Sequence, residues 1–206
     1  MEHHNTTHSK ILRQRGTMKN LLVVLTAFIL LSGCGSKDPE SAVYLREGLD
    51  LSYVSRVAVL PFENLSGEEN VGKRVRDITI TELLASGKFE VVDKGIVDAT
   101  LREMAISNEN SLDAPVLKIL GKRLEVNAFV SGTVNNIEGG SRGALAYPEV
   151  SLTLHLIDSE TAQVLWRSTA YRNGYSIWNR MFDLDPRDEF EITLSLLQDM
   201  VASIPK

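Results

Sequence analysis

The sequence predicts an α/β fold, in which a mixed sheet of about five strands forms a sandwich with helices packed on it. Short apolar runs at 56–62 and 127–134 are typical of buried strands. The segments between them place apolar residues at helical spacing, which favours parallel strands joined by helices. Residues 149–157 alternate between apolar and polar, which indicates a half-buried antiparallel strand.

The first strand and helix are marked by a proline and a glycine. The apolar run 56–62 contains Pro61 near its end, where a residue without an N–H cannot continue a central strand. A helix is predicted from about Asn70, because its apolar residues share one face: Val71, Val75 and Ile78. Gly87 suits the position after the helix end, where glycine takes a positive φ freely.

Two more helices follow a short second strand at 88–92. Asp93 can cap a helix with an apolar face formed by Val97, Leu101 and Met104. Pro115 suits the first turn of another, with its apolar face formed by Leu117, Leu120 and Leu124.

The final third of the chain predicts a loop, a hairpin and a helix. We expect a glycine-rich loop over 136–147, between the strand at 127–134 and a hairpin that pairs 149–157 with 163–169. Asp188 and Glu191 form a capping-box pattern. The apolar residues of that last helix step by four and three: Phe190, Leu194, Leu197, Val201 and Ile204.

The beginning of the chain has the pattern of a secretory signal peptide. Lys19 precedes an apolar run at 21–31, which is too short to span a bilayer. The run ends in Leu31, Ser32, Gly33 and Cys34, the only cysteine of the chain, and this motif resembles the lipobox of bacterial lipoproteins. The resemblance implies that Cys34 is acylated, with palmitate as an expected chain, and becomes the first mature residue. An ordinary cleaved signal with an incidental cysteine is the alternative.

These features predict three parts of the chain. We expect upstream residues and the signal peptide at 1–33, with Met18 as the natural start, a lipidated tether at 34–55, and a periplasmic domain at 56–206. The removed part holds four basic residues and one acidic residue, which leaves 18 against 26 and a net charge of about −8. Such a charge argues against nucleic acid as a partner and leaves the covalent lipid as the membrane attachment.

Four phrases in the predicted domain resemble one family. They lie at 57–66, 87–93, 128–134 and 156–166, and together they look like the curli-secretion lipoprotein (CsgG) family. Its relatives include the lipoprotein LpoB and the amino-terminal domain of TolB. The resemblance implies a TolB-N/CsgG-like fold over roughly 56–170, and Gly35 after the cysteine implies the outer membrane.

One departure from the curli transporter concerns pore formation. Each transporter subunit contributes two membrane hairpins, whereas 135–148 and 173–187 contain glycine, proline and aspartate residues and are short for that purpose. We therefore expect the soluble domain without the pore.

No catalytic residue, metal site or cofactor is predicted, and the chain is not expected to be an enzyme. His155 lies on the polar face of a strand without an evident acid partner. The repeated Gly-Lys-Arg at 72–74 and 121–123 lacks the glycine spacing of a phosphate-binding loop. The acidic group of Asp183, Asp185, Asp188 and Glu189 lacks the spacing of a calcium loop and favours a helix cap.

Aromatic residues and methionine gather between the predicted last strand and last helix. They are Tyr171, Tyr175, Trp178, Met181 and Phe182. Such residues are enriched at protein interfaces, so we consider them a possible partner contact; the alternative is that they fold back onto the core.

The sequence favours an outer-membrane lipoprotein that faces the periplasm and binds envelope proteins, or itself, as a non-enzymatic assembly factor in envelope biogenesis or secretion. The alternative is a subunit of an oligomeric secretion channel or its collar. A periplasmic enzyme is the third hypothesis, for which no constellation of catalytic side chains is visible.

Overall fold

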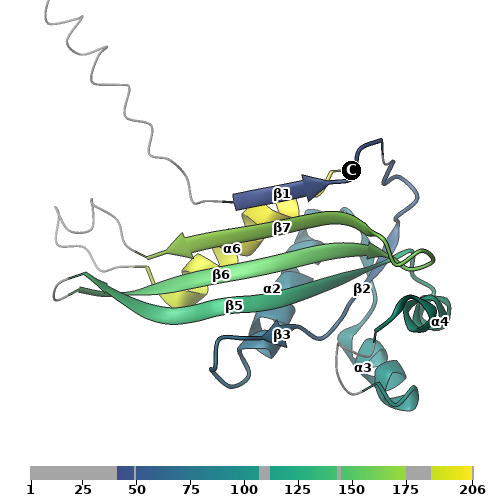
Figure 1. Ribbon diagram of the computed structural model, residues 1–206, viewed down its shortest axis with the longest axis horizontal. Coiled ribbons are helices and arrows are strands. Elements are labelled where there is room, and N and C mark those ends of the chain that lie inside the picture. Colours follow the sequence, from purple (N-terminus) through teal and green to yellow (C-terminus); the bar gives the residue numbers. More distant parts are fainter. Residues whose placement is uncertain (1–40, 49, 107–111, 143–144, 175–186, 206) are drawn as a thin grey trace, which may run out of the picture. The chain divides into compact units, whose positions relative to one another are not determined.

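A seven-stranded mixed sheet organises the computed structural model (Figure 1), which describes residues 41–48, 50–106, 112–142, 145–174 and 187–205. The strands are β1 (Ser41–Leu45), β2 (Arg56–Val59), β3 (Glu63–Asn64), β4 (Glu90–Val91), β5 (Ala128–Arg142), β6 (Leu145–Asp158) and β7 (Val164–Asn173). The helices are α2 (Val71–Ser86), α3 (Lys94–Glu103), α4 (Ala114–Leu124) and α6 (Glu189–Ala202). The predicted α/β class is confirmed, with more strands than the five expected.

Helices cover both faces of the sheet. One core joins α2 and α6 to the sheet face that carries Val57 and Val59, and these helices lie behind the sheet in Figure 1. The second core joins α3 and α4 to the opposite face, with Ala58 and Leu60 of the same strand region. Successive side chains of a strand point to opposite faces, so the apolar run around β2 is buried on both sides.

The parallel half of the sheet places β2 at its centre. The order along the sheet is β1-β7-β6-β5-β2-β4, with β2 parallel to both β4 and β5. The chain passes from β2 through α2 to β4 on one face, and from β4 through α3 and α4 to β5 on the other. The carboxyl end of β2 therefore opens between α2 and α3.

The predicted glycine-rich loop at 136–147 is wrong. β5 and β6 pair continuously from Ala128 opposite Asp158 to Arg142 opposite Leu145, with one irregularity after Val134. The physical reason is packing: Ile137 faces Val150 across the strands, and both side chains are buried. The buried pair and the cross-strand hydrogen bonds offset the low strand propensity of the glycines.

The predicted tether contains a strand. β1 pairs antiparallel with β7, from Ser41 opposite Ala170 to Leu45 opposite Trp166, so the sheet begins before the predicted boundary at residue 56. All five residues of β1 are exposed. Because no side chain of β1 is buried in the core, the sequence carries no half-buried alternation that would reveal it.

Most predicted helix ends are confirmed. Asp93 accepts hydrogen bonds from the Gly95 and Ile96 N–H groups, and Asp188 accepts one from the Glu191 N–H. Gly87 follows α2 at φ 61°. Phe190, the first apolar residue in the predicted four-and-three spacing of the last helix, is 58% exposed, and α6 buries residues that include Ile192 and Leu196.

Candidate interaction surface

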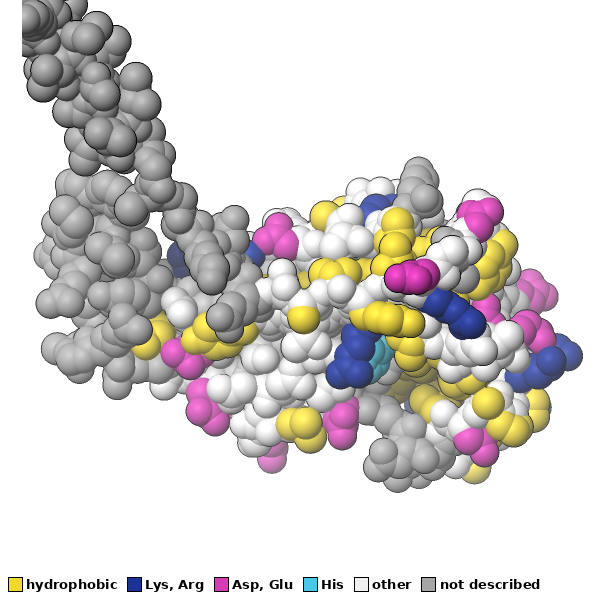
Figure 2. Space-filling view, turned by 45° about the horizontal axis from the view of Figure 1, so that its top comes forward, with side chains coloured by type: hydrophobic (Ala, Val, Ile, Leu, Met, Phe, Trp, Pro, Cys, Tyr) yellow, Lys and Arg dark blue, Asp and Glu magenta, His cyan; other side chains and the backbone are white. Residues whose placement is uncertain are grey.

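The front of the antiparallel half of the sheet is a polar surface. In Figure 1 no described helix lies over β6, β7 and β1 on this side. Its side chains form cross-strand rows given by the register: Ser131, His155, Arg167 and Tyr44 in one row, and Thr133, Thr153, Thr169 and Ala42 in the next. Figure 2 shows much of this region in white, the colour of uncharged polar side chains and backbone.

Hydrogen bonds between side chains tie neighbouring strands together on this surface. The Asn135 Nδ2 atom donates to the Thr153 hydroxyl at 2.9 Å, and the Thr153 and Thr169 hydroxyls lie 3.1 Å apart. Cross-strand pairs of this kind stabilise a sheet. These bonds link β5 to β6 and β6 to β7 on this surface.

His155 is half-buried in the first row rather than freely exposed. Its Nε2 atom is buried and has no hydrogen-bond partner among the described residues. Burial, and secondly the positive charge of Arg167, lower the pKa of His155 from its ordinary 6.5. The imidazole is therefore neutral at pH 7. The charged residue opposite it is Arg167, a cation, whereas a catalytic histidine is oriented by an acidic side chain.

The lowered pKa of His155 predicts a pH-dependent stability. Below about pH 6.5 the unfolded chain takes up a proton that the folded chain resists, so stability falls as pH falls through this range. We expect His155→Gln to lose less free energy of unfolding than the unchanged protein between about pH 7.5 and about pH 5. Urea unfolding at both pH values measures this, and parallel curves for the two proteins would contradict the assignment.

Strand β1 provides a free edge beside this surface. Among the described residues it pairs with β7 alone, so its other edge has no strand beside it. Val43, Tyr44 and Leu45 are 50%, 53% and 43% exposed. Tyr44 lies in the polar row with Arg167, whereas Val43 and Leu45 lie on the opposite face. Natural edge strands commonly carry charges or proline that prevent pairing with another chain, and β1 has neither.

The chain that leaves β1 is fastened to the hairpin between β6 and β7. The Arg46 guanidinium donates to the Gln163 side chain, and the Arg46 N–H donates to the Leu165 carbonyl. The Tyr53 hydroxyl donates to Asp158 at 2.7 Å; burial, followed by this contact, raises the pKa of Tyr53 to about 12. These contacts hold β1 at the edge although its own side chains are exposed.

Of the five aromatic and methionine residues predicted as a partner contact, the structure describes Tyr171 alone. Tyr171 does not lie in a loop: it is part of β7, half-buried, opposite Ser151 on the polar surface, and its hydroxyl accepts a hydrogen bond from Asn173. Tyr175, Trp178, Met181 and Phe182 lie outside the described residues, as do Leu31, Ser32, Gly33 and Cys34. Sequence reasoning missed β1, whose only signal is the short Val43-Tyr44-Leu45 run.

No family description matches the chain, and no curated protein is significantly similar to it. Among solved structures, the PelC dodecamer from Paraburkholderia phytofirmans has a TM-score of 0.53 at 18% identity, over 79% of this chain and 96% of that chain. The hypothetical protein CT253 from Chlamydia trachomatis has a TM-score of 0.50 at 12% identity, over 73% and 95%. The LpoB C-terminal domain from Escherichia coli has a TM-score of 0.46 at 14% identity, over 61% and 88%.

These similarities concern the fold. They support the predicted mixed α/β sandwich, whereas membership of the CsgG family is not shown. None of the described helices combines the length and apolar character of a membrane-spanning helix. The described residues also contain no group of three or more side chains placed to hold a metal ion.

Proposed function

We propose that this chain is a lipoprotein of the outer membrane, held by lipid on Cys34, whose α/β domain faces the periplasm as a non-enzymatic binding and assembly factor. Its role would lie in envelope biogenesis or secretion. The observation that carries the proposal is the uncharged edge of β1, which no other described strand covers, with exposed Val43, Tyr44 and Leu45. An edge of this kind binds another chain through main-chain hydrogen bonds and side-chain contacts.

A second copy of the chain is the partner that we consider first. The support is the similarity in fold to PelC, a protein solved as a dodecamer. β1 also adjoins the polar surface of β6 and β7, so a partner chain that pairs with β1 would lie beside this surface. Other envelope proteins could use the same edge, because main-chain pairing places few demands on sequence.

The second candidate function is a subunit of an oligomeric secretion channel or its collar. It is favoured by the same dodecamer and by the long β5–β6 hairpin, in which pairing continues through 135–148, the segment predicted to be too short for two membrane strands. The number of subunits separates the two functions. A closed ring of many copies supports the channel or collar, and a dimer supports the anchored assembly factor.

Introducing charges on β1 is expected to abolish self-association. In the double variant Val43→Lys and Leu45→Lys, two ammonium groups would be desolvated at a pairing edge, so the assembly should dissociate to monomers. The measurement is the molar mass of the acylated protein in mild detergent, by light scattering after size exclusion.

The matched control places the same two charges on exposed apolar residues of α3 and α4. Ile96 and Ile119 are 55% and 51% exposed, and Ile96→Lys with Ile119→Lys should retain the original mass. If the unchanged protein is a monomer at all concentrations, self-association is wrong. If both double variants dissociate, the β1 edge is not the contact.

A further inference from the structure

A basic pocket lies at the carboxyl end of β2, away from the β1 edge. It has a volume of about 410 Å³ and is lined by four cations and one anion: Lys73 and Arg76 of α2, and Lys94, Arg102 and Asp98 of α3. The pocket lining therefore carries a net charge of +3, in a chain with a formal charge of −5. Its position between two crossovers on opposite sheet faces is where open α/β sheets commonly bind ligands.

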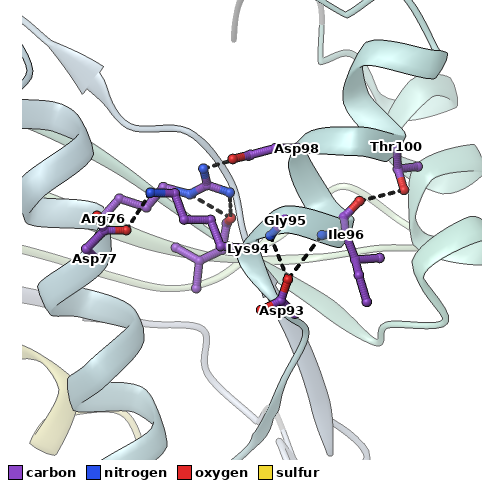
Figure 3. Close-up of polar contacts among 9 residues, drawn as sticks. Arg76, Asp77, Asp93, Lys94, Gly95, Ile96, Asp98 and Thr100 are labelled. Carbon is purple, nitrogen blue, oxygen red and sulfur yellow. Dashed lines mark hydrogen bonds and ion pairs between the residues drawn. The ribbon is translucent and has the colours of Figure 1, made fainter.

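Arg76 is a buried, fixed cation at the base of this pocket. The residue is 4% exposed. Its Nε and Nη2 atoms donate to the Val59 carbonyl at 3.1 Å and 2.7 Å, and Nη1 donates to Asp98 at 2.7 Å. These bonds engage three of the five N–H groups of a guanidinium. Figure 3 shows the guanidinium held between α2 and α3, so its positive charge has a fixed position in the lining of the pocket.

Internal ion pairs account for only part of the positive charge. Asp98 pairs with Arg76, and Asp77 pairs with Lys94 at 2.6 Å. Among the described residues, Lys73 has no ion pair and donates a hydrogen bond to the neutral side chain of Asn70, and Arg102 has no hydrogen bond or ion pair with a side chain. If the pocket served only to join α2 to α3, the two ion pairs would suffice.

The N-terminal amides of α3 are not part of the binding group. The Gly95 and Ile96 N–H groups already donate to the Asp93 carboxylate, at 2.8 Å and 3.3 Å, as Figure 3 shows. An anion in the pocket would therefore be held by side chains. Guanidinium and ammonium groups together suit a phosphate, because arginine offers a planar fork and lysine a point charge.

The remaining wall of the pocket is apolar. It consists of Pro61, Phe62, Leu101 and Ile106, and Phe62 and Leu101 are buried. The volume lies in the range of small-molecule sites, about 300–1,000 Å³. We propose that this pocket binds a small phosphate ester, with the phosphate on the basic side chains and the organic group on the apolar wall. The source could be a soluble ester or the headgroup of a lipid.

The test is calorimetric titration of the full-length acylated protein in nonionic detergent. Three probes are used: phenyl phosphate, dihexanoyl phosphatidate and inorganic phosphate. The double variant Lys73→Gln and Arg102→Gln is expected to weaken binding of the organic probes by at least about 10-fold. The control, Lys118→Gln with Arg123→Gln on α4, removes the same charge outside the pocket and should leave affinity unchanged.

The outcomes separate the two sources. Tighter binding of phenyl phosphate supports a soluble ester, and tighter binding of dihexanoyl phosphatidate supports a lipid headgroup. The proposal is overturned if neither organic probe binds, if inorganic phosphate binds as tightly as both, or if the control variant loses affinity as much as the pocket variant.

Discussion

Replacing Cys34 with serine is expected to remove the lipid from this protein completely. In the lipobox hypothesis, Cys34 is both the acyl acceptor and the residue at the cleavage site, so we expect the variant to lose the lipid and to keep its signal peptide. Labelling with palmitate and the mass of the purified chain measure both effects. Ser36→Ala is the control, because it changes a small residue close by and should be labelled and cleaved normally.

A second arm tests whether the lipid is the membrane attachment. A chain with an ordinary cleavable signal fused before Gly35 should appear in the soluble periplasmic fraction, because the predicted mature part has a net charge of about −8 and is not attracted to anionic lipid. Membrane retention of that chain would show that another element binds the membrane. Undiminished labelling of the serine variant would contradict Cys34 as the lipidated residue.

Replacing Arg76 with methionine is expected to destabilise the fold by about 2–4 kcal/mol. Methionine retains much of the side-chain volume and removes the bonds to the Val59 carbonyl and Asp98. The buried carbonyl then loses its arginine donors, and α2 keeps only the more exposed Asp77–Lys94 ion pair of its two ion pairs with α3. Asp98 is partly exposed, so water can hydrate its carboxylate after Arg76 is removed. The expected loss of stability is therefore smaller than the largest values for broken buried ion pairs.

Arg74→Met is the matched control for that prediction. Arg74 lies on the same helix, and its ion pairs with Glu68 and Glu189 join side chains that are largely exposed. Surface pairs contribute little, so the expected loss is below about 1 kcal/mol. Urea unfolding of both variants measures the difference, and equal losses would contradict a structural role for the buried guanidinium.

The core of the fold could be predicted because the spacing of its apolar residues along the sequence indicates which side chains are buried. The alternation of Leu152, Leu154 and Leu156 with polar neighbours identifies one face of β6, and Asp93 and Gly87 mark helix ends by their own local chemistry. These signals depend on residues close in sequence. The order of the four helices and of β2, β4, β5, β6 and β7 therefore followed from the sequence, and with it the fold class, whereas β1 and β3 were not predicted.

The candidate surfaces could not be predicted in the same way. β1 is a strand only because β7 pairs with it, and no side chain of β1 is buried to mark it in the sequence. The hairpin through Gly139 and Gly140 exists because Ile137 and Val150 meet across the strands. Likewise, Arg76 and Asp98 meet only because two crossovers lie on opposite faces of β2.

By itself the sequence determined the α/β class and the helix caps, and it predicts the lipidation of Cys34, since each depends on side chains within a few residues of one another. The tertiary structure alone decided which strand forms the free edge, how far the β5–β6 hairpin extends, and which charges share a pocket. Those features depend on contacts between residues distant in sequence, where the free energy of pairing and burial overrides local propensity.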